Sequence, residues 1–595
     1  MTTSKLHEAR RAVAPQIGSS GLGTRFSNRW HAKRAARARP AAGFVSQPEP
    51  RTIGSFARGK QLLAGNFLFA GHLVNAPDYM LWDISPPNPA FIEETQGFAW
   101  LDDLASVGDT EARERAQEWM FGWIDAYGAG RGEGWTPDLT GRRLIRWISH
   151  ALFLMRGMSS EQSKWFFRSL GQQTLFLARR WRGATPGLPR FEALTGLIYA
   201  GFSLTGVDVH VEAAIQALAR ECTDQIDDQG GIPTRNPEEL LEVFTLLNWA
   251  ALTLRESDRE PEPAHLEAIN RIAPTLRALR HADGGLARFH GGGRGLDGRL
   301  DHALANSGVR AGVNEGLAMG YARLSAGRTS VIMDGAPPPV GNASANGHAS
   351  TLAFELTSGR RPVIVNCGSG VQFGPEWHKA GRATPSHSVL GVTGMSSSRL
   401  TAPQVLDGIE RTFLVQTPKQ VPLERVVGVG TNGIVAAHDG YVATHGLTHM
   451  RKLELNVSGR ELSGEDTLAA VTDADQKVFD AALDDTSLQG VPFTLRFHLH
   501  PEVDATLDMG GTAISLALRS GEIWVFRFEG GGELMLQSSI YLEKSRLKPR
   551  KTKQVVLSGV AMDYATRIRW TLAKAQDTPT VLRDLETGDR SELPN

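Results

Sequence analysis

One stretch of the sequence decides the fold: Glu376-Trp377-His378-Lys379-Ala380-Gly381-Arg382-Ala383-Thr384-Pro385-Ser386-His387-Ser388-Val389-Leu390. It follows an apolar, β-like run at 362–367 and a glycine-rich turn at 368–370, and it leads into a second apolar run. We therefore expect His387 where a loop becomes a strand, with Arg382 and Trp377 close by in the sequence. A titratable ring, a fixed cation and an aromatic face on one loop suit an anionic sugar better than they suit a protein core.

Upstream of this stretch, from about residue 97 to 280, apolar residues recur with the period of a helix. Leu144, Ile148 and Met155, for example, lie on one helical face. The pattern predicts helices at 112–127, 162–181, 191–204, 211–226, 238–254 and 266–279. Short polar or Gly/Pro breaks separate them, so consecutive helices are expected to pack as antiparallel neighbours. Periodicity alone leaves a bundle, a solenoid and a closed toroid open.

After about residue 317 the apolar period changes to two. The segments 351–356, 453–457 and 523–528 alternate between apolar and polar residues, which is typical of half-buried strands. Strands recur at close spacing to the end of the chain. Helices followed by strands, without alternation, indicate two domains, the second an antiparallel sandwich, rather than a parallel α/β sheet.

These features resemble the heparinase II/III family of polysaccharide lyases. Its members carry an Arg, a short spacer and Ala-His-Ser/Asn-Thr-Leu, a pattern similar to Arg382 and 386–390. Further short motifs agree in order along the chain: Gly97–Leu101, Gly230-Gly231, Arg235–Pro237, His438–Tyr441, His449–Arg451 and Arg496–Pro501. The resemblance implies an incomplete α/α toroid followed by an antiparallel β-sandwich. We expect a basic arm at 1–49, the toroid at 50–316 and the sandwich at 317–595.

Composition excludes several classes of function. The 595 residues include 64 Lys+Arg and 64 Asp+Glu, so the overall charge predicts no nucleic-acid partner. The two cysteines, Cys222 and Cys367, lie in different expected domains, so we expect no disulfide framework. No apolar run approaches the ~20 residues of a membrane span, so we expect no transmembrane segment.

The first forty residues are rich in Lys and Arg, with Glu8 as their single acid. No apolar run that would suit a secretory signal follows. Two interpretations stay open: a solvated, flexible arm, or a basic surface segment that touches anionic lipid or polymer. The resemblance implies the periplasm or cell envelope, whereas the missing export signal leaves the cytoplasm open.

The resemblance implies cleavage of an acidic, uronate-containing polysaccharide by β-elimination. That reaction needs a group that neutralises the uronate carboxylate, a base for the C5 proton and an acid for the leaving oxygen. We predict His387, Tyr441 and Arg235 as catalytic residues. The predicted substrate-binding residues are Arg190, Glu192, Asn236, Glu239, Trp377 and Arg382. A structural alternative for 235–239 is a helix start, with Asn236 as N-cap and Pro237 in the first turn.

The chain departs from the family pattern at two places. The family's Asn-His pair falls on Leu188 and Pro189, and its tyrosine falls on Glu239. A second hypothesis is therefore a non-catalytic carbohydrate-binding or envelope-polysaccharide assembly protein that keeps the fold. No cofactor is expected. Some family members hold a structural zinc, for which His387, Asp407, His445 and His449 are available here, although their spacing is not that of a compact zinc motif.

Overall fold

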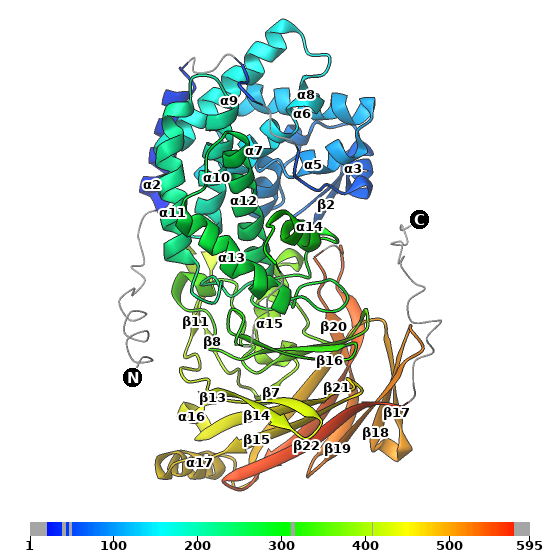
Figure 1. Cartoon of the computed structure of the whole chain (residues 1–595). Coiled ribbons are helices and arrows are strands. Elements are labelled where there is room, and N and C mark those ends of the chain that lie inside the picture. The colour runs from blue at the N-terminus through cyan, green and yellow to red at the C-terminus, as the bar shows by residue number, and fades with distance from the viewer. Residues whose placement is uncertain are drawn as a thin grey trace.

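The structure is a computed structural model that describes residues 21–38, 43–46, 50–310, 316–406, 409–544 and 546–575. In Figure 1 a helical part lies above two β-sheets. The helical series ends with α14 (Arg299–Asn306), and the first strand of the large sheets, β3, begins at Tyr321. The chain is an incomplete α/α toroid followed by an antiparallel β-sandwich, so the expected fold class is confirmed.

The predicted helices form close to their expected positions: α6 (Thr110–Tyr127), α9 (Ser160–Arg180), α10 (Leu188–Ser203), α11 (Val211–Gln225), α12 (Pro237–Glu256) and α13 (Pro263–Ala278). The toroid also contains α3 (Phe56–Leu63), α4 (Pro89–Gln96), α5 (Trp100–Val107), α7 (Pro137–Ser149) and α8 (Ala151–Met155). Caps fix several of these starts. Ser159 and Gln162 form a capping box at α9, which satisfies two backbone N–H groups that the helix itself leaves without partners.

Helix α10 is the centre of the helical packing, because it contacts α7, α9, α11 and α12. Its crossing with α7 depends on Gly141 and Gly196. A Cβ atom on Gly196 would lie 2.5 Å from Cα of Gly141, so any larger residue would push the helices apart. The close crossing places Arg142 of α7 beside Glu192 of α10.

Part of the expected basic arm, residues 21–38, lies against the toroid. These residues include α2 (Gly21–Ala35), which packs on α9. Ala32 and Ala35 are buried, and the Arg180 side chain donates a hydrogen bond to Asn28. Small residues spaced by three and four form a narrow apolar face that the basic composition obscured. Residues 1–20 lie outside the described residues.

Two large antiparallel sheets make the sandwich. The lower sheet has the strand order β12 (Leu423–Gly428), β13 (Thr431–Tyr441), β14 (Leu447–Asn456), β15 (Glu461–Ala469), β22 (Ala565–Lys574), β19 (Ile523–Glu529), β18 (Ala513–Leu518), β17 (Val503–Asp508). The upper sheet has the order β20 (Glu533–Tyr541), β21 (Arg550–Ala561), β16 (Val491–Leu499), β6 (Arg361–Val365), β5 (Phe354–Ser358), β4 (Thr329–Asp334), β3 (Tyr321–Ala326), with β7 (Leu390–Val392) also paired to β16. Rings join the sheets: Trp570 of the lower sheet stacks on Phe354 of the upper sheet.

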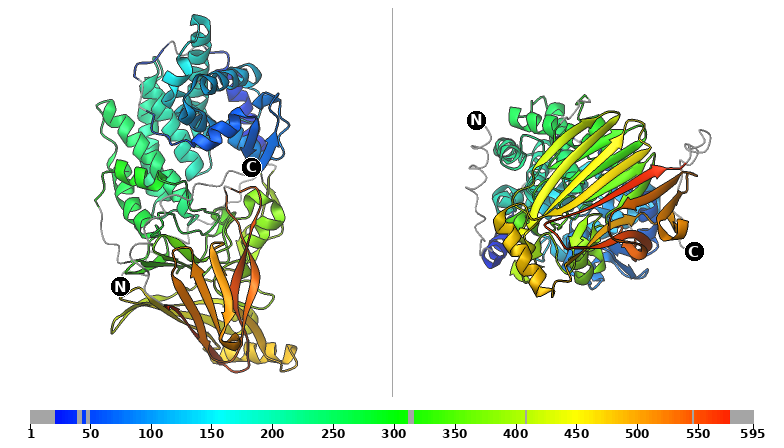
Figure 2. Two further views of the ribbon diagram at one scale, coloured as in Figure 1. Left: turned by 90° about the vertical axis from the view of Figure 1, so that its right-hand side faces the viewer. Right: turned by 90° about the horizontal axis from the view of Figure 1, so that it is seen from below.

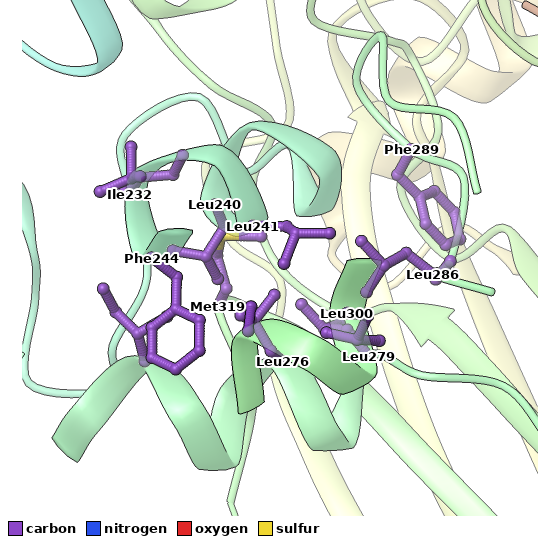
Figure 3. Packing of buried hydrophobic residues seen from close by; sticks show 14 of the residues in the cluster. Ile232, Leu240, Leu241, Phe244, Leu276, Leu279, Leu286, Phe289, Leu300 and Met319 are labelled. Carbon is purple, nitrogen blue, oxygen red and sulfur yellow. The ribbon is translucent and has the colours of Figure 1, made fainter. Parts of the chain in front are cut away.

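The toroid meets the sandwich through an apolar cluster that Figure 3 shows from close by. Leu240 and Phe244 of α12 and Leu276 of α13 pack there with Phe289 and Met319, which belong to the connection into the sheets. All five are almost completely buried. The contact holds the segment before α12 against the sandwich, where the candidate site lies.

Candidate functional site

His387 lies between a short 3-10 turn (Thr384–Ser386) and β7, as expected from the sequence. Its side chain is completely buried. Nδ1 lies 2.9 Å from the carbonyl oxygen of Ala383, and Nε2 lies 3.0 Å from Nδ1 of His348. Both ring nitrogens therefore have partners within the protein.

The neighbouring hydrogen bonds assign the protons on these two rings. The backbone N–H of Gly291 donates to Nε2 of His348 at 3.1 Å. His348 must then carry its proton on Nδ1 and donate it to Nε2 of His387, which in turn donates from Nδ1 to Ala383. Both rings are neutral, and burial lowers the pKa of His387 to about 4. The one lone pair that could accept a substrate proton is already hydrogen-bonded.

The network continues towards the toroid. The backbone N–H of His348 donates to Nδ1 of His290, so Nε2 of His290 carries the proton and faces Asp334 at 3.5 Å. Asp334 pairs with Arg235 at 2.5 Å and accepts from the hydroxyl of Ser350 at 2.8 Å. Burial acts to raise the pKa of Asp334, but Arg235 and His290 together outweigh it and lower that pKa to about 2. One buried polar network thus joins the segment before α12, the loop at residue 290, the end of β4 and the loop at residues 348–350.

Arg235 is a structural residue in this arrangement. Its guanidinium also donates to the backbone carbonyls of Met319, Gly320, Ala336 and Pro337. With every nitrogen engaged, it has no free edge for a substrate carboxylate. The predicted helix start at the next residue is confirmed, because Asn236 accepts from the backbone N–H groups of 238 and 239.

Arg190 and Glu192 of α10 are held by other partners. Arg190 pairs with Glu221 at 3.1 Å and donates to the carbonyl of Ala184. Glu192 pairs with Arg142 at 2.6 Å, and burial raises the pKa of its carboxyl to about 7. Among the described residues, no hydrogen bond or ion pair joins either side chain to the His387 network. The structure therefore does not bring Arg190 together with His387.

Tyr441 and Arg382 are also internal. Tyr441 is completely buried with its hydroxyl 3.4 Å from the carbonyl of Leu390, and burial raises its pKa. Arg382 is 1% exposed and donates to the carbonyls of Gly347, Ser344 and Thr412, where it pins two loops together. Neither position offers the side chain to a polymer.

Two of the predicted binding residues are more accessible. Trp377 is 38% exposed on α15 (Pro375–Gly381). Glu239 is partly exposed in the first turn of α12, and burial raises the pKa of its carboxyl. Of the predicted site residues, Trp377 and Glu239 are thus accessible to a ligand. Neither an indole ring nor a carboxyl group can neutralise the carboxylate of a uronate.

The residues available for a structural zinc do not converge. His445 lies on α16 (Val442–His445) and bonds to Thr444, while His387 belongs to the network above. His449 contacts His438 at 3.2 Å and Asp466 at 2.8 Å in the lower sheet. Asp407 lies outside the described residues. Among the described His, Cys, Asp and Glu residues, no group of three could hold a metal ion.

Arg451 supplies the positive charge beside Asp466 instead. Its guanidinium donates to Asp466 at 2.8 Å and to the carbonyls of Leu352 and Ser388. Ser388 is the neighbour of His387, so the two buried networks touch. Sequence reasoning missed Asp334, His290 and His348, because partners joined across such long separations leave no local spacing to recognise.

The C-terminal part of the chain matches a family model. Residues 309–571 match the model described as "Heparinase II/III-like, C-terminal". This match identifies the C-terminal part of the chain as a heparinase II/III-like C-terminal domain, and the whole chain shares the fold of heparinase III.

A similar curated protein is "FtsZ-localized protein C" of Caulobacter vibrioides, which is 29% identical over 567 residues, 93% of each chain. Among solved structures, heparinase III matches with a TM-score of 0.66 and 12% identity over 92% of this chain and 89% of that one. A heparan sulfate lyase HepC mutant from Pedobacter heparinus matches with a TM-score of 0.54 and 13% identity, over 97% and 92% of the two chains. The structural matches show the shared fold.

Proposed function

We propose that this chain is a non-catalytic member of the heparinase II/III-like family that localises with FtsZ and uses the lyase fold as a binding scaffold. The observation that carries this proposal is the state of His387: it is completely buried and its acceptor nitrogen is occupied by His348. A base must come within hydrogen-bond reach of the proton it removes. FtsZ enters through the name of the relative that spans 93% of both chains.

The groups that would neutralise the uronate carboxylate also support a non-catalytic role. Arg190, Arg235 and Arg382, the cations that could neutralise a uronate carboxylate, are all bonded to protein acceptors. The segment 183–197, where the family carries its Asn-His pair, contains neither residue type. Without a cation or hydrogen-bond donor at the carboxylate, the C5 proton of a uronate is too weakly acidic to be removed. An acidic polysaccharide as substrate is therefore the less favoured proposal.

The test of this function has two arms. Purified protein mixed with a panel of acidic polysaccharides is expected to give no rise in the absorbance of unsaturated uronates. A fluorescent fusion of the chain, produced in Caulobacter vibrioides, is expected to follow FtsZ through the division cycle. A rise in absorbance that His387→Ala abolishes would establish a lyase instead, and a diffuse fusion would contradict the localisation.

The exposed side of α2 suits contact with an anionic surface, as the basic arm first indicated. Phe26, Trp30 and Lys33 are spaced by four and three residues and share one face, which lies opposite the buried Asn28 and Ala32. Phe26 is 74% exposed and Trp30 is 50% exposed. Aromatic rings among Lys and Arg are typical of helices that lie in the headgroup layer of a membrane. Within the described residues, no helix is long and apolar enough to cross a bilayer.

We therefore expect the chain to bind vesicles that contain phosphatidylglycerol and to bind pure phosphatidylcholine poorly. The double substitution Arg29→Glu and Lys33→Glu should weaken vesicle binding by about tenfold or more, since each basic residue near an anionic surface contributes ~1 kcal/mol. Cosedimentation measures this change. The matched control is Lys477→Glu on the exposed helix α17 (Asp473–Asp485), which should bind like the unchanged protein. Equal loss in both variants would contradict the role of α2.

A further inference from the structure

The outer face of the lower sheet contains a hollow that the proposed function does not use. Its volume is about 390 Å³, and it is lined by residues of β14, β15, β22 and β19. In the view from below in Figure 2, these strands lie in front of the upper sheet. We call this hollow the outer groove.

Strand register explains the shape of the outer groove. Glu454, Ser463, Thr571 and Arg527 stand side by side on neighbouring strands, so two short residues lie between two long ones. Strands in a sheet are ~4.8 Å apart, so this row is about 14 Å long. Ser463 and Thr571 form its floor.

The adjacent row forms a charged wall. Lys452, Glu465, Arg569 and Glu529 stand side by side on the same four strands, with alternating charge. Glu465 pairs with Arg569 at 2.8 Å, and Lys452 pairs with Glu454 at 2.9 Å. The positive and negative charges of the wall largely cancel. The wall is nevertheless hydrophilic along the whole length of the groove.

The floor is fixed from inside the sandwich. A Cβ atom on Gly464 would lie 2.1 Å from the indole of Trp570, so the ring fills the space that a side chain would take. The indole N–H donates to Asp466 at 2.9 Å, and the ring stacks on Phe526. The groove is therefore preformed, which lowers the entropy lost when a ligand binds.

Arg527 is the group that the outer groove leaves for a ligand. It is exposed at one end of the floor, and within the described part of the chain no hydrogen bond or ion pair engages its guanidinium. A guanidinium binds a carboxylate with two parallel hydrogen bonds, and the hydroxyl of Thr571 stands beside it as a further donor. The chemistry at this end selects an anion.

The rest of the groove favours a peptide over a sugar. Sugar rings stack on exposed aromatic faces, but Trp570 is buried behind the floor. A length of about 14 Å fits four to five residues of extended peptide at ~3.3 Å each. Alternating charges along the wall can match the polar side chains of such a segment.

We propose that the outer groove docks an extended acidic peptide segment of FtsZ, with a carboxylate of that segment on Arg527 and its backbone across Ser463 and Thr571. This inference rests on the proposed function, because it names the surface through which the chain meets FtsZ. It places the partner on the face of the sandwich that points away from the toroid (Figure 1).

The test measures the affinity of purified full-length chain for purified, fluorescently labelled FtsZ. Arg527→Glu replaces the attraction by repulsion and should weaken binding by about tenfold or more, and Thr571→Lys should block the floor with a similar loss. The matched control is Lys551→Glu, the same charge change at an exposed position of β21 in the other sheet, which should stay within about twofold. Circular dichroism checks that each variant is folded.

The outcomes separate the two proposals. Weakened binding in both groove variants, with the control unchanged, supports the outer groove. Unchanged binding of both groove variants overturns the groove and leaves the localisation with FtsZ intact. No binding by the unchanged protein overturns the groove as an FtsZ site, while the fluorescent fusion decides separately whether the chain follows FtsZ in cells.

Discussion

Replacing Asp466 by asparagine is expected to lower the free energy of unfolding by about 3–5 kcal/mol, the usual cost of removing one partner of a buried ion pair. Asp466 is completely enclosed between the sheets. It accepts from Arg451, from His449 and from the indole of Trp570. Asparagine carries no charge, so the Arg451 cation would stay buried without its counter-ion. Urea unfolding at pH 7.5, followed by tryptophan fluorescence, measures the loss.

The neighbouring residue on the same strand gives a matched control. Glu465 points to the outer face, where it pairs with Arg567 and Arg569, both more than half exposed. Exposed ion pairs contribute only about 0–1 kcal/mol, so Glu465→Gln should leave the unfolding midpoint almost unchanged. Equal effects of the two substitutions would show that the buried pair does not hold the sandwich together.

The positions of the helices could be predicted from the sequence because their causes are local. The apolar period fixed α9 to within two residues of the expected 162–181, and Asn236 with Pro237 marked the start of α12. Strands followed from the period of two in the same way, as at β19. Helix α2 could not be recognised from the apolar pattern, because its buried face consists of small, weakly hydrophobic residues such as Ala32 and Ala35.

The candidate site could be predicted only in part, because its electrostatics depend on residues far apart in the chain. His387 was correctly placed at the end of a loop, but its partner His348 is 39 residues away. Arg235 looked available in the sequence, and its counter-ion Asp334 lies 99 residues further on. A cation and a histidine near a family motif indicate chemistry equally well whether they face a cleft or each other. Only the fold decides between these two arrangements.

Acid is expected to unfold the protein before most carboxylates are protonated. Burial lowers the pKa of His265 and His387 to about 4 and that of His498 to about 3, against 6.5 for an ordinary histidine. Between pH 6.5 and about 4, these histidines therefore bind protons in the unfolded chain but not in the folded chain. Stability is fully present above pH 6.5 and falls as the pH drops from 6.5 towards 4. Asp334, whose pKa is lowered to about 2, contributes its own loss only below about pH 4.

The size of this effect follows from the pKa differences. At pH 4.5 each of the three rings contributes a loss of about 2–3 kcal/mol, at 1.36 kcal/mol per pKa unit. Glu192 offsets a loss of about the size of one ring's contribution. Its carboxyl has a raised pKa of about 7, so protonation of Glu192 stabilises the folded state as the pH falls through that value. The net loss approaches the ~5–15 kcal/mol that holds a typical domain together. Urea midpoints between pH 7.5 and 4.5 should therefore fall steeply.

A single substitution can show that the buried rings cause this fall. His265 is 2% exposed and bonds through Nε2 to the carbonyl of Leu247. Glutamine keeps a donor for that carbonyl but cannot titrate, so His265→Gln should reduce the proton uptake on unfolding by about one between pH 6.5 and 4.5. The same change at His302, exposed on α14, is the control. A midpoint that stays constant down to pH 4.5 in the unchanged protein would mean that these histidines are protonated in the folded state, and the neutral hydrogen-bond chain from Gly291 to Ala383 would then be wrong.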